Sequence, residues 1–281
     1  MKLLRVGPIG AEKPAILARD GSLRSLAHII PDVSGAALSP VSLAALAAID
    51  IETLPKIAPG MRIGPCVGGT TKIICIGLNY ADHAAESGMQ VPPEPVFFMK
   101  ATSSIAGPND AVPIPPGAQK VDWEVELGVI IGTRCKRVRE VDALRYVAGY
   151  CVTNDLSERE WQLERQGQWS KGKSHDGFAP LGPWLVTRDE VPDPQKLRLW
   201  LDVDGRRFQD GNTQTMVYGV AKLIAYISEF MTLLPGDVIS TGTPPGVGLG
   251  QNPPIYLRPL QRMRLGIDGL GEQDQTTFED R

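Results

Sequence analysis

The sequence has few histidines and cysteines, and it has no excess of basic residues over acidic ones. It contains only three histidines, and its four cysteines show no C-x-x-C spacing. A zinc knuckle or a disulfide framework is therefore not expected. The formal net charge of −3 supplies neither a basic field for nucleic acid nor a polybasic anchor for a membrane surface.

Long apolar runs are also missing. The opening residues, MKLLRVGPIGAEKP, contain no apolar stretch of secretory length, and VSLAALAAI, from Val41, is too short to span a bilayer. We therefore expect a cytoplasmic protein with no membrane partner and no nucleic-acid partner.

Short, β-branched apolar segments separated by glycine and proline make up most of the chain. From residue 72 onward they predict strands at 72–77, 95–100, 123–132, 146–155, 197–205, 237–242 and 262–268. Helices are predicted at 39–50, where Ser39 is the cap and Pro40 the first helical residue, and at 142–146, 157–166 and 217–235. The pattern favours a β-rich α+β fold, with a small N-terminal α/β unit at 1–70 and a larger unit at 71–281.

Two glutamates, Glu124 and Glu126, stand one residue apart in the apolar segment VDWEVELGVIIG. In a strand they point to the same face, where two like charges need a cation or solvent. Asp155 ends another apolar segment, YCVTND. Three carboxylates at strand ends can supply half of an octahedral oxygen shell, which favours magnesium or manganese over zinc. A solvated carboxylate face is the alternative interpretation.

The segment NYADHAAESG places His83 and Glu86 three residues apart on a predicted short helix. A carboxylate that orients an imidazole makes it a better general base, although most such pairs are surface ion pairs. We expect the segment 79–91 to be mobile without ligand, as a lid over the site.

Two glycine-containing segments partly match the sequence patterns of nucleotide-binding loops. GQWSKGKS, residues 167–174, matches the phosphate-loop pattern but lacks a buried strand before it and a helix after it. STGTPPGVGLG, residues 240–250, lacks the third glycine of a dinucleotide loop. Nucleotide binding is rejected, and Lys173 and Thr243 remain candidates for a substrate site.

Seven motifs in consistent order resemble the fumarylacetoacetate hydrolase family: IGLNYADHAAE, PVFFMK, DWEVELGVIIG, YCVTNDLSERE, GKSHDGFAPLGPW, LPGDVISTGTPPGVG and LGIDGLG. The strings look most like those of bacterial enzymes that hydrolyse 2,4-diketo-3-deoxy sugar acids, and acylpyruvate hydrolases are nearly as similar. The resemblance implies a mixed β-sandwich roll that is usually a homodimer.

The resemblance also implies roles for individual residues. Those roles are metal ligands (Glu124, Glu126 and Asp155), a catalytic dyad with an active-site lysine (His83, Glu86 and Lys173), and substrate contacts (Arg159, Gln162, Thr243 and, weakly, Lys100). The implied activity is metal-dependent hydrolysis of the C–C bond of a 2,4-diketo acid, with Mg²⁺ or Mn²⁺ as cofactor, to give pyruvate and a carboxylic acid. Oxaloacetate decarboxylation or oxo-acid tautomerisation at the same site is the main alternative, and a non-catalytic metal-dependent ligand sensor is a further one.

Overall fold

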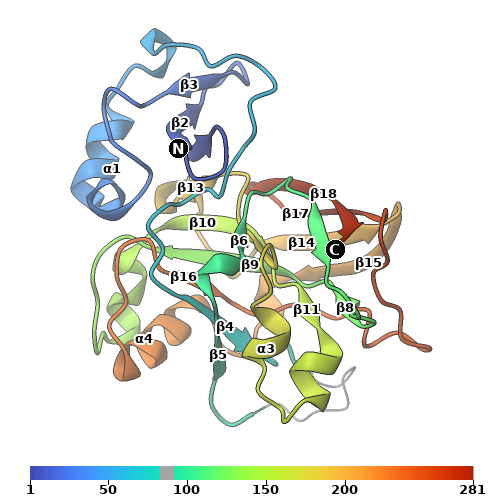
Figure 1. Cartoon of the computed structure of the whole chain (residues 1–281). Coiled ribbons are helices and arrows are strands. Elements are labelled where there is room, and N and C mark those ends of the chain that lie inside the picture. Colours follow the sequence, from blue (N-terminus) through green and yellow to red (C-terminus); the bar gives the residue numbers. More distant parts are fainter. Residues whose placement is uncertain (83–91, 281) are drawn as a thin grey trace.

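Two β-sheets dominate the structure, a computed structural model that describes residues 1–82 and 92–280 (Figure 1). The larger sheet has nine strands in the order β3-β2-β1-β13-β10-β9-β16-β4-β5, and the smaller has five in the order β15-β14-β17-β18-β7. Each sheet contains both parallel and antiparallel neighbours. The predicted β-rich α+β class is confirmed.

The strands are short, as the spacing of glycine and proline predicts. Those of the larger sheet are β1 (Lys2–Val6), β2 (Lys13–Leu17), β3 (Leu23–Ser25), β4 (Ile73–Gly77), β5 (Val96–Lys100), β9 (Val125–Ile131), β10 (Val147–Asn154), β13 (Leu185–Thr187) and β16 (Val238–Ser240). Those of the smaller sheet are β7 (Val112–Ile114), β14 (Arg198–Val203), β15 (Arg206–Asn212), β17 (Arg262–Ile267) and β18 (Gly271–Glu279). Two further pairs join β8 (Val121–Asp122) to β11 (Ser157–Glu158) and β6 (Ile105–Ala106) to β12 (Ala179–Pro180).

Helices are few and lie around the sheets (Figure 1). Those that lie wholly within the described residues are α1 (Pro40–Ala47), α3 (Ser170–Lys173), α4 (Val220–Phe230) and a π-helix at Glu160–Glu164, with 3-10 segments at Gly35–Leu38, Ile51–Thr53, Thr102–Ser104, Glu140–Tyr146, Arg188–Glu190 and Thr213–Thr215. Ser39 caps α1 as predicted, because its side chain accepts a hydrogen bond from the backbone of Ser42. Among the described residues, no helix has the length and apolar character needed to cross a bilayer.

Two predicted helices differ from what forms. The segment at 142–146 is part of a 3-10 helix rather than an α-helix. The helix predicted at 157–166 is reduced to the π-helix, because Ser157 and Glu158 pair with β8 as a strand instead. Tertiary pairing overrides local helix propensity there.

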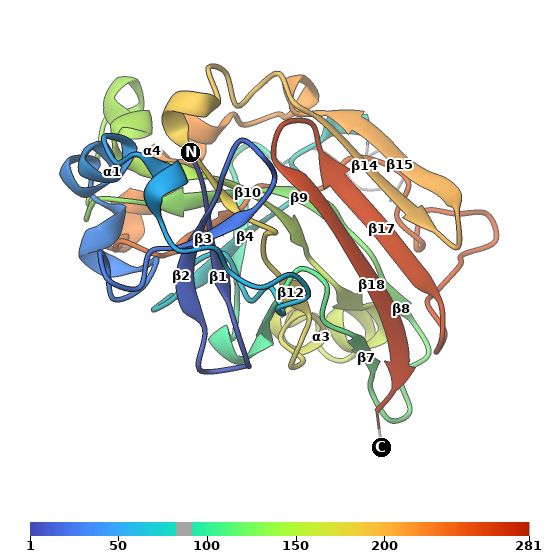
Figure 2. The ribbon, with the colours of Figure 1, turned by 90° about the horizontal axis from the view of Figure 1, so that it is seen from above.

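The N-terminal strands belong to the larger sheet, since β1 pairs antiparallel with β13. Figure 2 shows the strands of the smaller sheet side by side along one flank of the molecule, with β1 to β3 toward the other. The main core lies between the two sheets, where β9 packs against β14 and β17. All seven residues of β9 are buried, because the strand has neighbours in its own sheet on both edges and a second sheet across one face.

Candidate metal centre and active-site pocket

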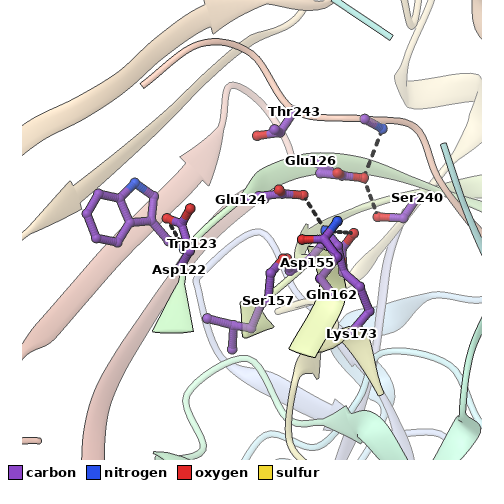
Figure 3. Close-up of polar contacts among 12 residues, drawn as sticks. Asp122, Trp123, Glu124, Glu126, Asp155, Ser157, Gln162, Lys173, Ser240 and Thr243 are labelled. Carbon is purple, nitrogen blue, oxygen red and sulfur yellow. Dashed lines mark hydrogen bonds and ion pairs between the residues drawn. The ribbon is translucent and has the colours of Figure 1, made fainter. Parts of the chain in front are cut away.

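Three carboxylates meet where strands β9 and β10 lie side by side (Figure 3). Glu124 directly precedes β9, Glu126 is its second residue, and Asp155 directly follows β10. The antiparallel register places Thr153 opposite Glu126, and the backbone N–H of Asp155 donates to the Glu124 carbonyl over 2.9 Å. One oxygen from each carboxylate lies within 4.8 Å of the others, and all three side chains are buried.

This acidic triad, Glu124, Glu126 and Asp155, consists of the oxygen ligands that a hard divalent ion prefers. Carboxylate oxygens are the donors that Mg²⁺ and Mn²⁺ prefer, and three of them leave coordination positions for water and substrate. Burial, together with the neighbouring charges of Asp155 and Glu124, raises the pKa of Glu126 well above its usual value. A cation held by the triad would relieve that repulsion, so the residues present fit a metal ion.

Lys173 is the charged partner of the triad. It ends α3, and its Nζ lies 2.7 Å from Glu124 Oε2 and 2.8 Å from Asp155 Oδ2. Burial by itself would lower the pKa of this ammonium group, but Asp155 and Glu124 outweigh burial and raise it above its ordinary value. Lys173 therefore stays positively charged although only 2% of its side chain is exposed.

Lys100 approaches Asp155 from the other side. It ends β5, and its Nζ hydrogen-bonds to Asp155 Oδ1 and donates to the carbonyls of Leu156, at 3.1 Å, and Phe178, at 2.8 Å. These three acceptors match the three protons of an ammonium group. Lys100, for which a weak substrate role was predicted, is not among the described residues that line the adjoining pocket, and its contacts hold Asp155 in place.

Arg159 joins the triad to a fourth buried acid. Its Nε donates to Asp122 Oδ2 at 2.8 Å, one terminal nitrogen pairs with Glu124 Oε1 at 2.6 Å, and the other donates to Gln162 Oε1 at 3.0 Å. Burial opposes its charge, but the pKa of the guanidinium is raised by Asp122 and Glu124. The bond to Gln162 Oε1 leaves the amide Nε2 of that residue as a donor on the pocket wall.

Asp122 was not predicted as a site residue, yet it is fully buried and organises this corner. Besides Arg159, it accepts the backbone N–H groups of Gly248, at 2.6 Å, and Leu249, at 3.0 Å. The single carboxylate thus fixes the glycine-rich loop after β16 against the residue that pairs with Glu124. A charged residue between Val121 and Trp123 in an apolar segment was the available signal.

Glu126 is held from the loop that follows β16. Its Oε2 accepts the Ser240 hydroxyl at 2.6 Å and the Gly242 N–H at 2.9 Å. One oxygen of the carboxylate is therefore oriented by the protein. Ser240 was also not predicted, because nothing in its local sequence separates it from any other serine at a strand end.

Thr243, the predicted substrate contact in the same loop, lines the pocket. Its hydroxyl donates to the Val125 carbonyl at 2.9 Å and accepts from Gln209 Nε2 at 2.7 Å. Gln209 in turn accepts the N–H of Val125 at 3.0 Å. This buried network fixes the loop to the first residue of β9.

The acids open into one pocket that also collects most of the predicted substrate contacts. Its described lining includes Glu124, Glu126, Arg159, Gln162, Lys173 and Thr243, together with Gly77 and the apolar residues Ile76, Leu78, Phe98, Leu163, Trp169 and Leu249. Asp155 lies behind this lining, bound to both lysines.

The predicted dyad, His83 and Glu86, lies outside the described residues, as does most of the predicted lid. Its described start is fixed, because the Asn79 amide donates to the carbonyls of Thr241, at 2.7 Å, and Tyr218, at 3.0 Å.

The segment at 167–174 is not a phosphate loop, since the π-helix rather than a buried strand precedes it.

Comparison with known proteins identifies the family of this chain. A family model described as fumarylacetoacetate hydrolase C-terminal matches residues 72–277. The chain belongs to the fumarylacetoacetate hydrolase family. A relative from Burkholderia ambifaria, whose name gives the class hydrolase without a substrate, is 65% identical over 99% of each chain.

Solved structures of this family carry more than one activity. A 5-carboxymethyl-2-hydroxymuconate delta-isomerase from Mycobacterium smegmatis is 31% identical, with a TM-score of 0.79 over the full length of both chains. A maleylpyruvate hydrolase from a Sphingobium species, solved with manganese(II) and pyruvate, is 28% identical, with a TM-score of 0.83 over both full lengths. The family is therefore one of enzymes, and it includes both hydrolases and isomerases.

Proposed function

We propose that this protein is a metal-dependent hydrolase that cleaves the C–C bond of a 2,4-diketo acid. The observation that carries the proposal is the buried acidic triad with Lys173 bound across Glu124 and Asp155, at the base of a pocket. A divalent ion bound there would act as a Lewis acid toward the oxo and carboxylate oxygens of the substrate. Acylpyruvates and 2,4-diketo-3-deoxy sugar acids are the substrate classes we carry forward.

In the proposed reaction, water adds to the 4-oxo carbon and the bond between carbons 3 and 4 breaks. The bonding electrons leave on carbon 3 as the enolate of pyruvate, which takes up a proton, and the acyl half departs as a carboxylic acid. Lys173 supplies fixed positive charge where negative charge develops. His83, oriented by Glu86 as the family resemblance implies, would accept the proton of the attacking water, a step worth typically ~10²–10⁴-fold.

Isomerisation, tautomerisation or decarboxylation is the second candidate, because the family relative from Mycobacterium smegmatis is an isomerase. Those reactions form an enolate without adding water. They would need the charged site but would not need a general base aimed at water.

The deciding experiment measures product release from an acylpyruvate, a 2,4-diketo-3-deoxy sugar acid, maleylpyruvate and oxaloacetate, in Mg²⁺ or Mn²⁺ and in EDTA. We expect EDTA-sensitive release of pyruvate with one equivalent of carboxylic acid from a diketo acid. Pyruvate and carbon dioxide from oxaloacetate alone, or an isomerised diketo acid without cleavage, would replace hydrolysis by the second candidate. Light scattering would test the homodimer that we propose on the family resemblance.

A further inference from the structure

We infer that the group beyond the 4-oxo carbon of the substrate is a short, uncharged and apolar acyl chain that packs on the apolar part of the pocket lining. The inference rests on the proposed hydrolysis of a 2,4-diketo acid. We call this surface the acyl wall and define it as Ile76, Leu78, Phe98, Leu163, Trp169 and Leu249.

The acyl wall is apolar because it collects side chains from several elements around the mouth of the site. Ile76 belongs to β4, Phe98 to β5, and Leu163 to the π-helix, while Leu249 is in the loop after β16. Every side chain of this set is a hydrocarbon except the Trp169 indole. An alkyl chain that leaves water for such a surface gains about fourfold in affinity per methylene.

The aromatic part of the wall is held in place by close packing. The Trp169 ring lies directly on Gly77, where an added Cβ would stand 2.5 Å from a ring carbon. Phe98 meets the same indole edge-on, with ring centroids 5.3 Å apart. A side chain larger than hydrogen at Gly77 would displace the Trp169 ring, so the glycine allows the ring its position in the wall.

Leu78 reaches the wall from a strained backbone. Its φ of 57° lies in the left-handed region, which a leucine rarely adopts. The following residue, Asn79, fixes this conformation through the two carbonyls that its side chain binds. Strain that is held by its surroundings is typical of positions with a functional demand, here an apolar side chain on the pocket lining.

A terminal carboxylate on the acyl chain would meet no unpaired cation on the described lining, where the Gln162 amide is an uncharged donor. Both cations there are already paired, Lys173 with Glu124 and Asp155, and Arg159 with Asp122 and Glu124. A second substrate carboxylate would be desolvated against hydrocarbon and close to acids. The wall therefore discriminates against dicarboxylic substrates of the maleyl or succinyl kind.

Two substrates of nearly equal shape test this. 4-Methylpentanoylpyruvate and succinylpyruvate differ only in ending with an isopropyl group or a carboxylate. With Mn²⁺ at pH 7.5 and 0.15 M salt, we expect kcat/KM for pyruvate release to favour the alkyl substrate by on the order of 100-fold. Equal or faster cleavage of succinylpyruvate would overturn the acyl wall and leave hydrolysis intact, whereas no pyruvate from either would remove the proposed function itself.

A pair of variants locates the effect on the wall. Leu163 lines the pocket and is 40% exposed, so Leu163→Lys places a cation at the wall without burying it. Leu260→Lys makes the same change in charge at a leucine that is 84% exposed and is not part of the lining. We expect Leu163→Lys to raise the succinyl-to-alkyl ratio of kcat/KM at least tenfold, and Leu260→Lys to leave it unchanged. An unchanged ratio in Leu163→Lys would show that the acyl end does not reach this wall.

Discussion

Replacing Lys173 by methionine should destabilise the metal-free protein and at the same time tighten its metal binding. Methionine keeps much of the volume of lysine but removes the ammonium group that bridges Glu124 and Asp155. Those two carboxylates, with Glu126 beside them, would then repel one another with less compensation in a buried site. The charge lost is the charge that a divalent ion can replace.

The size of the effect follows from the burial of the pair. Removing one partner of a buried ion pair costs about 3–5 kcal/mol. At about 2.1 cal/mol/K per residue, the unfolding entropy of a chain of 281 residues is about 0.6 kcal/mol/K. Dividing the lost free energy of unfolding by this entropy gives a fall in Tm of about 5–8 °C. Differential scanning calorimetry in EDTA measures this shift. Lys171→Met, in the same short helix at an exposed position, is the matched control and should change the free energy of unfolding by less than about 0.5 kcal/mol.

Saturating Mn²⁺ gives the second half of the test. Because Lys173 repels a cation bound to the same carboxylates, the metal should raise Tm more in Lys173→Met than in the wild-type protein. Titration calorimetry should show a lower Kd for Mn²⁺ in the variant, although its turnover falls. A variant that unfolds like Lys171→Met in EDTA, or that binds Mn²⁺ more weakly than wild type, would refute this account of the site.

Three further predictions concern the triad and its surroundings. Asp122→Asn should lower the free energy of unfolding by about 3 kcal/mol and raise KM, because Arg159 loses a buried charge partner. Urea unfolding measures the change in stability, and steady-state kinetics measure the change in KM. Because the pKa of Glu126 is raised in the folded protein, the free energy of unfolding of the metal-free protein should fall as pH rises above about 4.5, the usual value of the group. Glu126→Gln should flatten that slope in denaturant titrations. His83→Ala should lower kcat by ~10²–10⁴-fold and leave the Mn²⁺ affinity unchanged in titration calorimetry. Glu124→Gln should instead weaken Mn²⁺ binding. If both variants lost Mn²⁺ affinity equally, the separate roles of general base and metal ligand would be contradicted.

The strands and the acidic triad were predictable because each depends on a short local pattern. Apolar, β-branched segments between turn residues predicted β4, β5, β9, β10, β14, β16 and β17 in sequence order, and Ser39 with Pro40 marked the start of α1. Strands β7, β13, β15 and β18 were not predicted. Glu124 and Glu126 were conspicuous because charge is rare inside an apolar strand. Their proximity to Asp155 depends on the pairing of β9 with β10, which the local patterns do not show. Only the metal-ligand roles implied by the family resemblance brought the three residues together.

Residues that act through distant contacts were not predictable in the same way. Asp122 organises the site only because the fold brings in Arg159 from 37 positions away and the amide of Gly248 from 126. Lys100 carries no local sign that its three protons would all meet protein acceptors around Asp155. The acyl wall is equally nonlocal, since its leucines and aromatics look in the sequence like ordinary core residues.

The charges around the triad explain why so many ionised groups can be buried together. Ion pairs connect three acids, Asp122, Glu124 and Asp155, with three cations, Lys100, Lys173 and Arg159. Glu126 lies beside Glu124 and Asp155 and completes the charged cluster. Its formal charge is one negative unit, which a single proton would neutralise, in keeping with the raised pKa of Glu126. A divalent ion would instead leave one positive unit, and the carboxylate of a 2-oxo acid would cancel it. In the proposed C–C cleavage, the developing enolate would then be the only charge left uncompensated, and Lys173 would supply positive charge that stabilises it.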